Sequence, residues 1–272
     1  MNSGDGLTSK ADFELGLGTG SMRGPKCRET VTKALSIGYR HIDTARQYDN
    51  ESAIGEALTH SDVDRDSVFL ATKVHSKRLQ PADVRAEVRE STERLGVETL
   101  DLVYVHWPAH TYDPESTLLT LADLQDDGLI GHIGLSNFTP KLVREAEAVV
   151  PGRIFAVQAE CHPYLQQRQL HDIVDDIDAW LVAHTPLAHG DVLEDPDIQA
   201  IADEYGANPA QVALAWLLHR DRIAAIPGTR GAHLRSNMEA KDLELDEEDL
   251  ARIDAIDRRK RYVSYEFAPW TE

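Results

Sequence analysis

Cysteine is almost absent from this chain of 272 residues, and long apolar runs are missing altogether. The two cysteines, Cys27 and Cys161, are far apart in the sequence, so we do not expect disulfides to hold the fold together. No apolar run reaches the roughly 18 residues that a membrane-spanning helix needs, and the polar N-terminus has no apolar signal segment. We therefore expect a cytoplasmic protein that does not enter a membrane.

Positive charge is scarce as well. Lysine and arginine together number 28 against 47 aspartates and glutamates, which gives a formal net charge of -19 at pH 7. Such a charge repels nucleic acids and anionic membranes. It is similar to the surface charge of proteins from halophilic microbes, where concentrated salt screens the mutual repulsion of carboxylates. The sequence thus predicts a solvated acidic surface, and a halophilic source is our hypothesis.

Short apolar segments alternate with segments of helical periodicity along the whole chain. Strands are expected at residues 13–20, 38–43, 68–73, 100–105, 131–135, 154–160, 179–184 and 223–226. Helices are expected at residues 28–37, from 50 onward, and at 81–95, 115–125, 140–149, 166–176, 208–218, 232–240 and 246–256. Short strands that are apolar throughout are typical of a parallel sheet covered on both faces.

Eight such strands favour a closed (β/α)8 TIM barrel over an open doubly wound sheet. No linker divides the chain, so one domain is expected over residues 1–272. Residues 1–12 are expected to be a loose N-terminal end, and residues 257–272 a C-terminal tail over the pocket.

Polar residues stand where three consecutive predicted strands end. Asp43 ends the second strand and Tyr48 follows it in a loop, while Lys73 ends the third strand and His106 the fourth. The carboxyl ends of parallel barrel strands meet at one face, where such barrels place their active sites. A lone tyrosine or histidine more often packs than reacts, but four such residues on three neighbouring strands indicate an enzyme.

These residue types suit the reduction of a carbonyl group. A phenol with a pKa of about 10 is a poor proton donor at neutral pH, and a neighbouring ammonium, here Lys73, would lower the pKa of Tyr48. Asp43 would keep Lys73 charged, and His106 would orient the carbonyl oxygen. No side chain supplies a hydride, so a nicotinamide cofactor is implied.

Two other functions would use the same barrel. A lyase or isomerase would use Lys73 as a Schiff-base nucleophile. A catalytically silent regulatory subunit would bind NAD(P)H without turning over a substrate. The complete set of Tyr48, Lys73 and His106 favours the reductase over both.

Five motifs carry a resemblance to a known family. They are residues 38–51, Leu70-Ala71-Thr72-Lys73, Val105-His106-Trp107-Pro108, Gly134-Leu135-Ser136-Asn137-Phe138 and Val157-Gln158-Ala159-Glu160-Cys161-His162-Pro163-Tyr164. In this order they resemble the aldo-keto reductase family over residues 15–240. The resemblance implies a barrel that binds NAD(P)H in an extended pose without a Rossmann domain. It also implies Tyr48 as the general acid, Lys73 and Asp43 as the groups that tune it, and His106 as the residue that orients the carbonyl.

The same resemblance assigns the cofactor site. Ser136, Asn137 and Gln158 match the positions that hold the nicotinamide carboxamide. Where the family commonly has a tyrosine before Ser-Pro-Leu, a tyrosine that stacks on the nicotinamide, this chain reads His184-Thr185-Pro186-Leu187. His184 either stacks less strongly or is simply a histidine at a strand end.

A second departure concerns the 2′-phosphate of NADPH. In many members of the family a lysine and an arginine hold this phosphate, whereas here Gly228 takes the lysine position and His233 the arginine position. Arg230 could still meet the phosphate, a role that suits a guanidinium. The cofactor residues expected in this stretch are Gly228, Thr229, Arg230, His233 and Asn237. NADPH is the expected cofactor, with NADH as the alternative.

The substrate is expected to be a small carbonyl compound. Residues 109–114 form a short segment after His106, which resembles microbial members that reduce keto-sugars and small aldehydes. Trp107 is expected to bind substrate with His106, and Tyr265, Phe267 and Trp270 either close the pocket or merely cover the core. No metal-binding motif is present, so no metal is expected. We expect a monomer.

Overall fold

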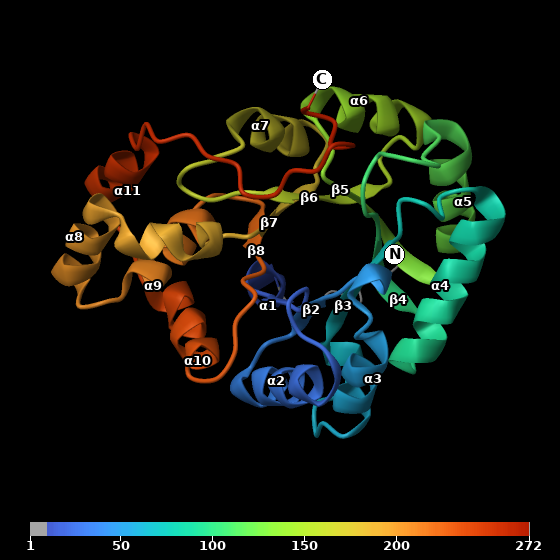
Figure 1. Cartoon of the computed structure of the whole chain (residues 1–272), viewed down its shortest axis with the longest axis horizontal. Coiled ribbons are helices and arrows are strands. Elements are labelled where there is room, and N and C mark those ends of the chain that lie inside the picture. Colours follow the sequence, from blue (N-terminus) through green and yellow to red (C-terminus); the bar gives the residue numbers. More distant parts are fainter. Residues whose placement is uncertain (1–9, 272) are drawn as a thin grey trace, which may run out of the picture.

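Eight parallel strands, each hydrogen-bonded to the next in sequence order, form the centre of the computed structural model, which describes residues 10–271 (Figure 1). The strands are β1 (Leu17–Gly18), β2 (His41–Asp43), β3 (Phe69–Val74), β4 (Leu100–Val105), β5 (Ile130–Ser136), β6 (Ile154–Glu160), β7 (Trp180–His184) and β8 (Ile223–Ala225). A parallel bridge pairs Leu15 with Ala225, and the Gly16 N–H donates to the Ala225 carbonyl at 2.9 Å. These bonds close the sheet on itself, so the predicted barrel is confirmed.

Helices follow the strands and cover the outside of the barrel (Figure 1). They are α2 (Gly24–Ile37), α3 (Glu51–Thr59), α4 (Pro81–Leu95), α5 (Pro114–Asp126), α6 (Pro140–Val149), α7 (Arg168–Asp176), α8 (Pro196–Tyr205), α9 (Pro209–Leu218), α10 (His233–Met238) and α11 (Glu247–Asp254). Local sequence sets many of these ends. In α4, Pro81 fits the first turn, where no backbone N–H is needed, and Gly96 adopts a left-handed conformation (φ +68°) after the last turn.

The start of the chain differs from the sequence-based expectation. The predicted first strand at 13–20 is reduced to Leu17–Gly18, because Phe13 belongs instead to a short helix, α1 (Lys10–Glu14). The Phe13 ring contacts the rings of Phe69, Phe155 and Trp180, residues at or near the beginnings of their strands. Helix α1 therefore closes the amino-terminal end of the barrel. The loose end expected through residue 12 is wrong from Lys10 onward, and residues 1–9 lie outside the described residues.

Helix α8 was not expected from the sequence. Its signals are nevertheless local: the Asp195 side chain accepts hydrogen bonds from the backbone N–H groups of Asp197 and Ile198, Pro196 opens the helix, and Gly206 ends it with a φ of +62°. Acidic residues inside the helix mask its apolar face. The result is an additional helix between β7 and β8, before α9.

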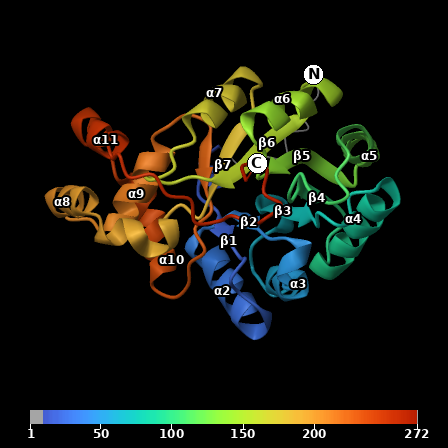
Figure 2. The ribbon, with the colours of Figure 1, turned by 45° about the horizontal axis from the view of Figure 1, so that its top comes forward.

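The C-terminal tail, defined as residues 256–271, runs across the barrel. It leaves α11 without helix or strand and, in Figures 1 and 2, runs across the barrel. Val263, Tyr265 and Phe267 of this tail line a pocket in the barrel. These three residues belong to the segment 257–272, which the sequence predicts as a tail over the pocket.

Candidate active site

The alternation of side chains along the strands brings polar residues to one end of the barrel. In β3, Phe69 and Ala71 pack inside the barrel, and Lys73 follows them on the same side. In β6, Ala156 packs inside and Gln158 follows it, just as Asp43 follows the inward His41 in β2. The inner face is thus apolar at its start and charged at its carboxyl end.

Lys73 and Asp43 form a fully enclosed ion pair. The Lys73 ammonium donates to Asp43 Oδ1 and, at 2.8 Å, to the Thr44 carbonyl oxygen. Asp43 Oδ2 accepts a hydrogen bond from Gln158 Nε2 at 2.7 Å. Burial opposes the charge on Lys73, but Asp43 and Tyr48 together outweigh it, and the pKa of Lys73 is raised above its ordinary value. Lys73 therefore stays protonated beneath the pocket.

Tyr48 and His106 face the pocket above this pair. Lys73 Nζ lies 5.3 Å from the centroid of the Tyr48 ring, and the ring centroids of Tyr48 and His106 are 5.8 Å apart. The expectation that Lys73 brings down the pKa of Tyr48 is wrong for the net effect. Burial raises this pKa and Asp43 adds to the rise, while Lys73 opposes them without reversing the direction. Tyr48 is thus a neutral phenol with its proton in place.

His106 is neutral for a similar reason. Burial, with the nearby Lys73, His75 and His184, holds the pKa of His106 well below its ordinary value. Its Nδ1 has no hydrogen-bond partner among the described residues, and its backbone carbonyl accepts a bond from Asn137 Nδ2 at 3.1 Å. A neutral imidazole at this point can donate one N–H toward an oxygen in the pocket.

A hydrogen-bonded group of polar side chains forms the opposite wall. Asn137, in a left-handed conformation (φ +63°), donates from Nδ2 to Ser136 Oγ at 3.0 Å. Its Oδ1 lies 3.1 Å from His184 Nε2, and His184 Nδ1 lies 3.0 Å from Thr185 Oγ1. Because a carbonyl oxygen only accepts, Nε2 carries the proton of His184. Both ring nitrogens of His184 are therefore engaged, which fixes the plane of its ring.

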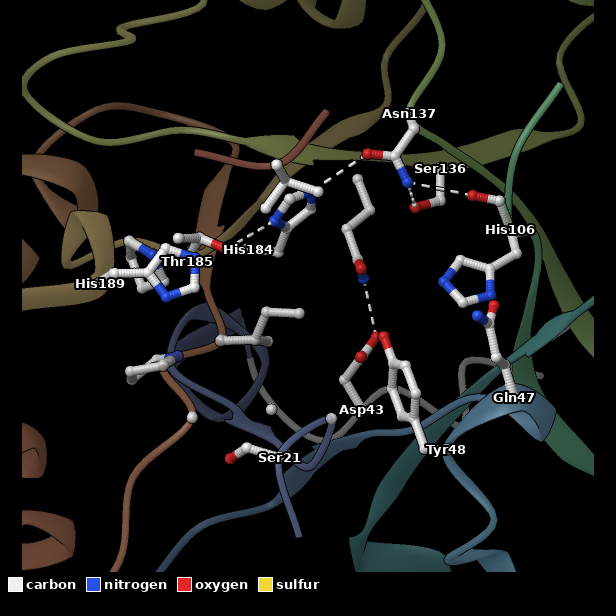
Figure 3. A pocket seen from close by; sticks show the side chains of 18 of the residues that line it. Ser21, Asp43, Gln47, Tyr48, His106, Ser136, Asn137, His184, Thr185 and His189 are labelled. Carbon is white, nitrogen blue, oxygen red and sulfur yellow. Dashed lines mark hydrogen bonds between the residues drawn. The ribbon is translucent and has the colours of Figure 1, made fainter. Parts of the chain in front are cut away.

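A pocket of about 710 Å³ joins these residues (Figure 3). Figure 3 shows Tyr48 and His106 on one side, His184 and His189 on the other, and Asp43 between them. The predicted site residues that line the pocket are Asp43, Tyr48, His106, Trp107, Ser136, Asn137, Gln158, His184, Thr185, Pro186, Leu187 and Gly228. Lys73 does not line it.

Other predicted cofactor residues lie outside this lining. They are Thr229, Arg230, His233 and Asn237, in the loop after β8 and in α10. Arg230 and His233 are exposed, whereas Asn237 is buried and its Nδ2 has no hydrogen-bond partner among residues 10–271.

Within the described residues, no group of three histidines, cysteines or carboxylates is placed to hold a metal ion, and no helix is long and apolar enough to cross a membrane.

Sequence reasoning missed part of the lining. The missed residues are Gly18, Gly20, Ser21, Gln47, His189, Gly190, Ile226, Pro227 and Val263. Gln47 immediately precedes Tyr48, so its position beside the site could have been inferred from the loop they share. At Gly18 a Cβ atom would lie 2.6 Å from the Ile226 carbonyl oxygen, which explains a glycine there by close backbone approach. The other residues carry no local signal.

Comparisons with known proteins place the chain in a family. The family model "Aldo/keto reductase family" matches residues 13–258. Methylglyoxal reductase DkgB of Yersinia pestis is 36% identical over 254 residues, which cover 92% of this chain and 95% of that protein. An aldo-keto reductase of Mycolicibacterium smegmatis is 35% identical over 256 residues, or 91% of this chain and 90% of that protein.

A solved structure agrees with these sequence relatives. The aldose reductase of Schistosoma japonicum superposes with a TM-score of 0.88 at 28% identity, covering 95% of each chain. The family model's match, residues 13–258, includes the strand ends that carry the polar residues described above. The chain therefore belongs to the aldo/keto reductase family and is an oxidoreductase of that family.

Proposed function

We propose that the protein reduces aldehyde or ketone carbonyls to alcohols with NAD(P)H, and that Tyr48 donates the proton. The observation that carries this proposal is the arrangement of Tyr48, neutral His106 and the buried Lys73–Asp43 pair. Lys73 Nζ is 5.3 Å from the Tyr48 ring centroid, and the His106 ring is 5.8 Å from it. A carbonyl oxygen in the pocket would meet both a phenol and an imidazole.

Each residue has a defined part in the proton transfer. The raised pKa of Tyr48 keeps the phenol protonated and ready to donate from its hydroxyl. The Lys73 ammonium then favours the phenolate that remains, because it stands close to the ring in a water-poor site. His106 donates a hydrogen bond to the same carbonyl oxygen and so orients it. A bound nicotinamide supplies the hydride.

The polar wall fits a nicotinamide carboxamide. The Ser136 hydroxyl accepts from Asn137 Nδ2, so its own proton is free to be donated. Both Nδ2 hydrogens of Asn137 are used, but its Oδ1 has a second lone pair beside the bond from His184. Gln158 donates from Nε2 to Asp43, which leaves Oε1 as an acceptor. One donor and two acceptors thus match the oxygen and the amino group of a carboxamide.

NADPH is the cofactor we propose, with NADH as the alternative. Arg230 is exposed in the loop after β8, where a guanidinium can bind a phosphate in a bidentate manner. Gly228 contributes no charge at the position where many relatives have a lysine. We expect NADPH to bind more tightly than NADH by a modest factor.

The position of Lys73 argues against Schiff-base chemistry. Its side chain is 1% exposed, it does not line the pocket, and its ammonium is hydrogen-bonded to Asp43 and Thr44. A Schiff base requires an accessible, neutral amine. The raised pKa of Lys73 works in the opposite direction.

The substrate we propose is a small aldehyde or 2-oxoaldehyde. One relative is named a methylglyoxal reductase, and that protein is 36% identical to this chain over 254 residues. Trp107, Tyr265 and Phe267 give the outer pocket an apolar lining that suits an uncharged organic group.

The first experiment follows the loss of the ultraviolet absorbance of reduced nicotinamide, with NADPH and with NADH, over a panel of aldehydes, keto-sugars and dicarbonyls. Tyr48→Phe should lower kcat by about 10²- to 10⁴-fold, the usual contribution of a general acid. Cofactor binding, followed by tryptophan fluorescence, should persist because Tyr48 is not among the carboxamide partners. Unchanged turnover in this variant would refute Tyr48 as the donor.

The same assay at low and molar salt, together with thermal unfolding, tests the proposal of a halophilic source. At a net charge of -19, molar salt should screen repulsion between surface carboxylates and raise both activity and the midpoint of thermal unfolding. An enzyme that is equally stable and active at low ionic strength would speak against this source.

A further inference from the structure

The carboxylate of Glu160 has no part in the proposed reaction, although it lies in the same motif as Gln158. Its side chain is 0% exposed at the carboxyl end of β6. Oε1 accepts a hydrogen bond from the Tyr262 backbone N–H at 2.7 Å, and Oε2 accepts one from the Val263 N–H at 2.8 Å. A barrel strand is thus attached to the C-terminal tail by one buried carboxylate.

His162 completes this attachment. Its Nδ1 accepts the Tyr164 backbone N–H at 3.2 Å, so its proton is on Nε2, which lies 2.9 Å from Glu160 Oε1. The Nε2–H group of His162 and two backbone amides therefore aim three N–H groups at one carboxylate. Burial alone would raise the pKa of Glu160, but these hydrogen bonds outweigh it and lower the pKa. Charge-assisted bonds of this kind are about twice as strong as neutral ones.

The residues that follow Val263 form a wall of the pocket. The Trp107 ring contacts Tyr265, Phe267 and Trp270, with ring centroids 5.4, 5.5 and 5.5 Å away. Among the described residues, every hydrogen bond of residues 264–271 is within that segment itself. Hydrogen bonds therefore attach the tail to the barrel only up to Val263. Beyond it the wall is held by ring contacts, with Trp107 and also between Phe267 and His110.

A second attachment lies at the surface. Asp191 accepts hydrogen bonds from the side chains of Arg258, Lys260 and Tyr262, at 2.6, 3.0 and 2.5 Å. Its ion pairs are more than a third exposed, so water and salt weaken them. Glu160 is the buried anchor, and it is the one that fixes the backbone next to the wall.

We propose that Glu160, supported by His162, is a positioning residue that determines substrate specificity by docking the tail against the barrel. The inference rests on the proposed carbonyl reduction. The docked tail presents Tyr265 and Phe267 to the pocket beside Trp107, which gives an aryl carbonyl a surface to pack on. A carbonyl compound as small as methylglyoxal reaches Tyr48 and His106 without that wall, so its binding depends less on Glu160.

The test compares Glu160→Gln with Glu56→Gln, the same change at an exposed carboxylate that pairs with Arg28 on the outside of the barrel. In Glu160→Gln an amide NH₂ replaces one acceptor and meets a backbone N–H. We expect the KM for benzaldehyde to rise about tenfold while kcat changes little, and the KM for methylglyoxal to rise much less, because about one charged hydrogen bond is lost. Glu56→Gln should behave as the wild type toward both substrates.

Limited trypsin digestion supplies a readout that does not depend on activity. Arg258, Arg259, Lys260 and Arg261 directly precede the docked residues, so a released tail should be cut faster in Glu160→Gln than in Glu56→Gln. If wild-type protein reduces no carbonyl, the proposed function fails, while the digestion still decides whether Glu160 docks the tail. Wild-type KM values together with a wild-type digestion rate would overturn the inference.

A second variant covers the case in which Glu160→Gln does not fold. Val263→Pro removes one of the two N–H groups from the tail side and leaves the barrel strand untouched, and Val263→Ala controls for the smaller side chain. The proline variant should show the same selective rise in the benzaldehyde KM and the faster digestion. Equal behaviour of the proline and alanine variants would overturn the inference.

Discussion

At the scale of single residues, Asp43 connects the buried polar side chains of the site. One of its oxygens holds Lys73 and the other accepts Gln158 Nε2. Asp43→Asn leaves a buried ammonium without its counter-charge. We expect the free energy of unfolding to fall by about 3 to 5 kcal/mol, the usual cost of breaking a buried pair from one side. Urea unfolding followed by circular dichroism measures it.

The double variant Asp43→Asn with Lys73→Met is the control for this prediction. Because it buries no unpaired charge, it should be more stable than the single variant, although it should lack activity. A single variant within about 1 kcal/mol of the wild type, the range of exposed pairs, would contradict the prediction.

The sequence predicts where the polar residues of the site lie, but not how burial and neighbouring charges combine to set the pKa of Tyr48. The sequence predicts that four residues lie at neighbouring strand ends: Asp43, Tyr48, Lys73 and His106. The prediction is possible because the apolar segments indicate where each strand ends and that the strands form a barrel. The net direction of the pKa of Tyr48 could not be predicted, because it depends on how deeply the ring is enclosed. The hydrogen bond between His184 and Asn137 is equally a product of the fold, since the two residues are distant in sequence.

At the scale of elements, one pair of neighbouring strands packs a large side chain inside the barrel against a glycine. Tyr104 of β4 pairs in register with Gly134 of β5, and a Cβ atom at Gly134 would lie 2.3 Å from the Tyr104 ring. Gly134→Val should therefore lower the free energy of unfolding by about 1 to 3 kcal/mol through overpacking. Adding Tyr104→Leu should recover part of the loss, measured by the same urea titration. If the two substitutions lower the free energy of unfolding additively, with no recovery in the double variant, the contact between residues 104 and 134 does not limit packing.

Sequence patterns predicted seven of the strands closely, and the exceptions have physical reasons. β1 is short because Phe13 belongs to helix α1. There its ring packs against the rings of Phe69, Phe155 and Trp180 at the amino-terminal end of the barrel. Helix α8 is not indicated by apolar periodicity because acidic residues interrupt its apolar face, and its caps are its main signal. The aromatic tail was anticipated near the pocket, but its anchor on Glu160 depends on a contact between residues about a hundred positions apart.

At the scale of the whole molecule, three enclosed histidines make the fold sensitive to acid. Burial is the first cause that lowers the pKa of His41, of His106 and of His184, the last to about 3. The unfolded chain takes up a proton at each of them as the pH falls below their ordinary value of 6.5, while the folded chain does not. Their contribution to stability is therefore complete above pH 6.5 and is lost as the pH falls toward the folded pKa values.

The expected result is a free energy of unfolding that is level above neutrality and that declines below pH 6.5, by up to about 1.4 kcal/mol per pH unit for each histidine. Urea titrations at half-unit steps measure the slope. His41→Phe should remove one third of it, because a phenyl ring can take the place of the imidazole stacked 4.5 Å from Phe13 without a titrating nitrogen. The exposed His219→Gln should keep the wild-type slope. Protonation of the carboxylate-rich surface relieves repulsion and would raise stability as the pH falls, so it cannot cause this decline. A slope unaffected by His41→Phe would contradict the prediction.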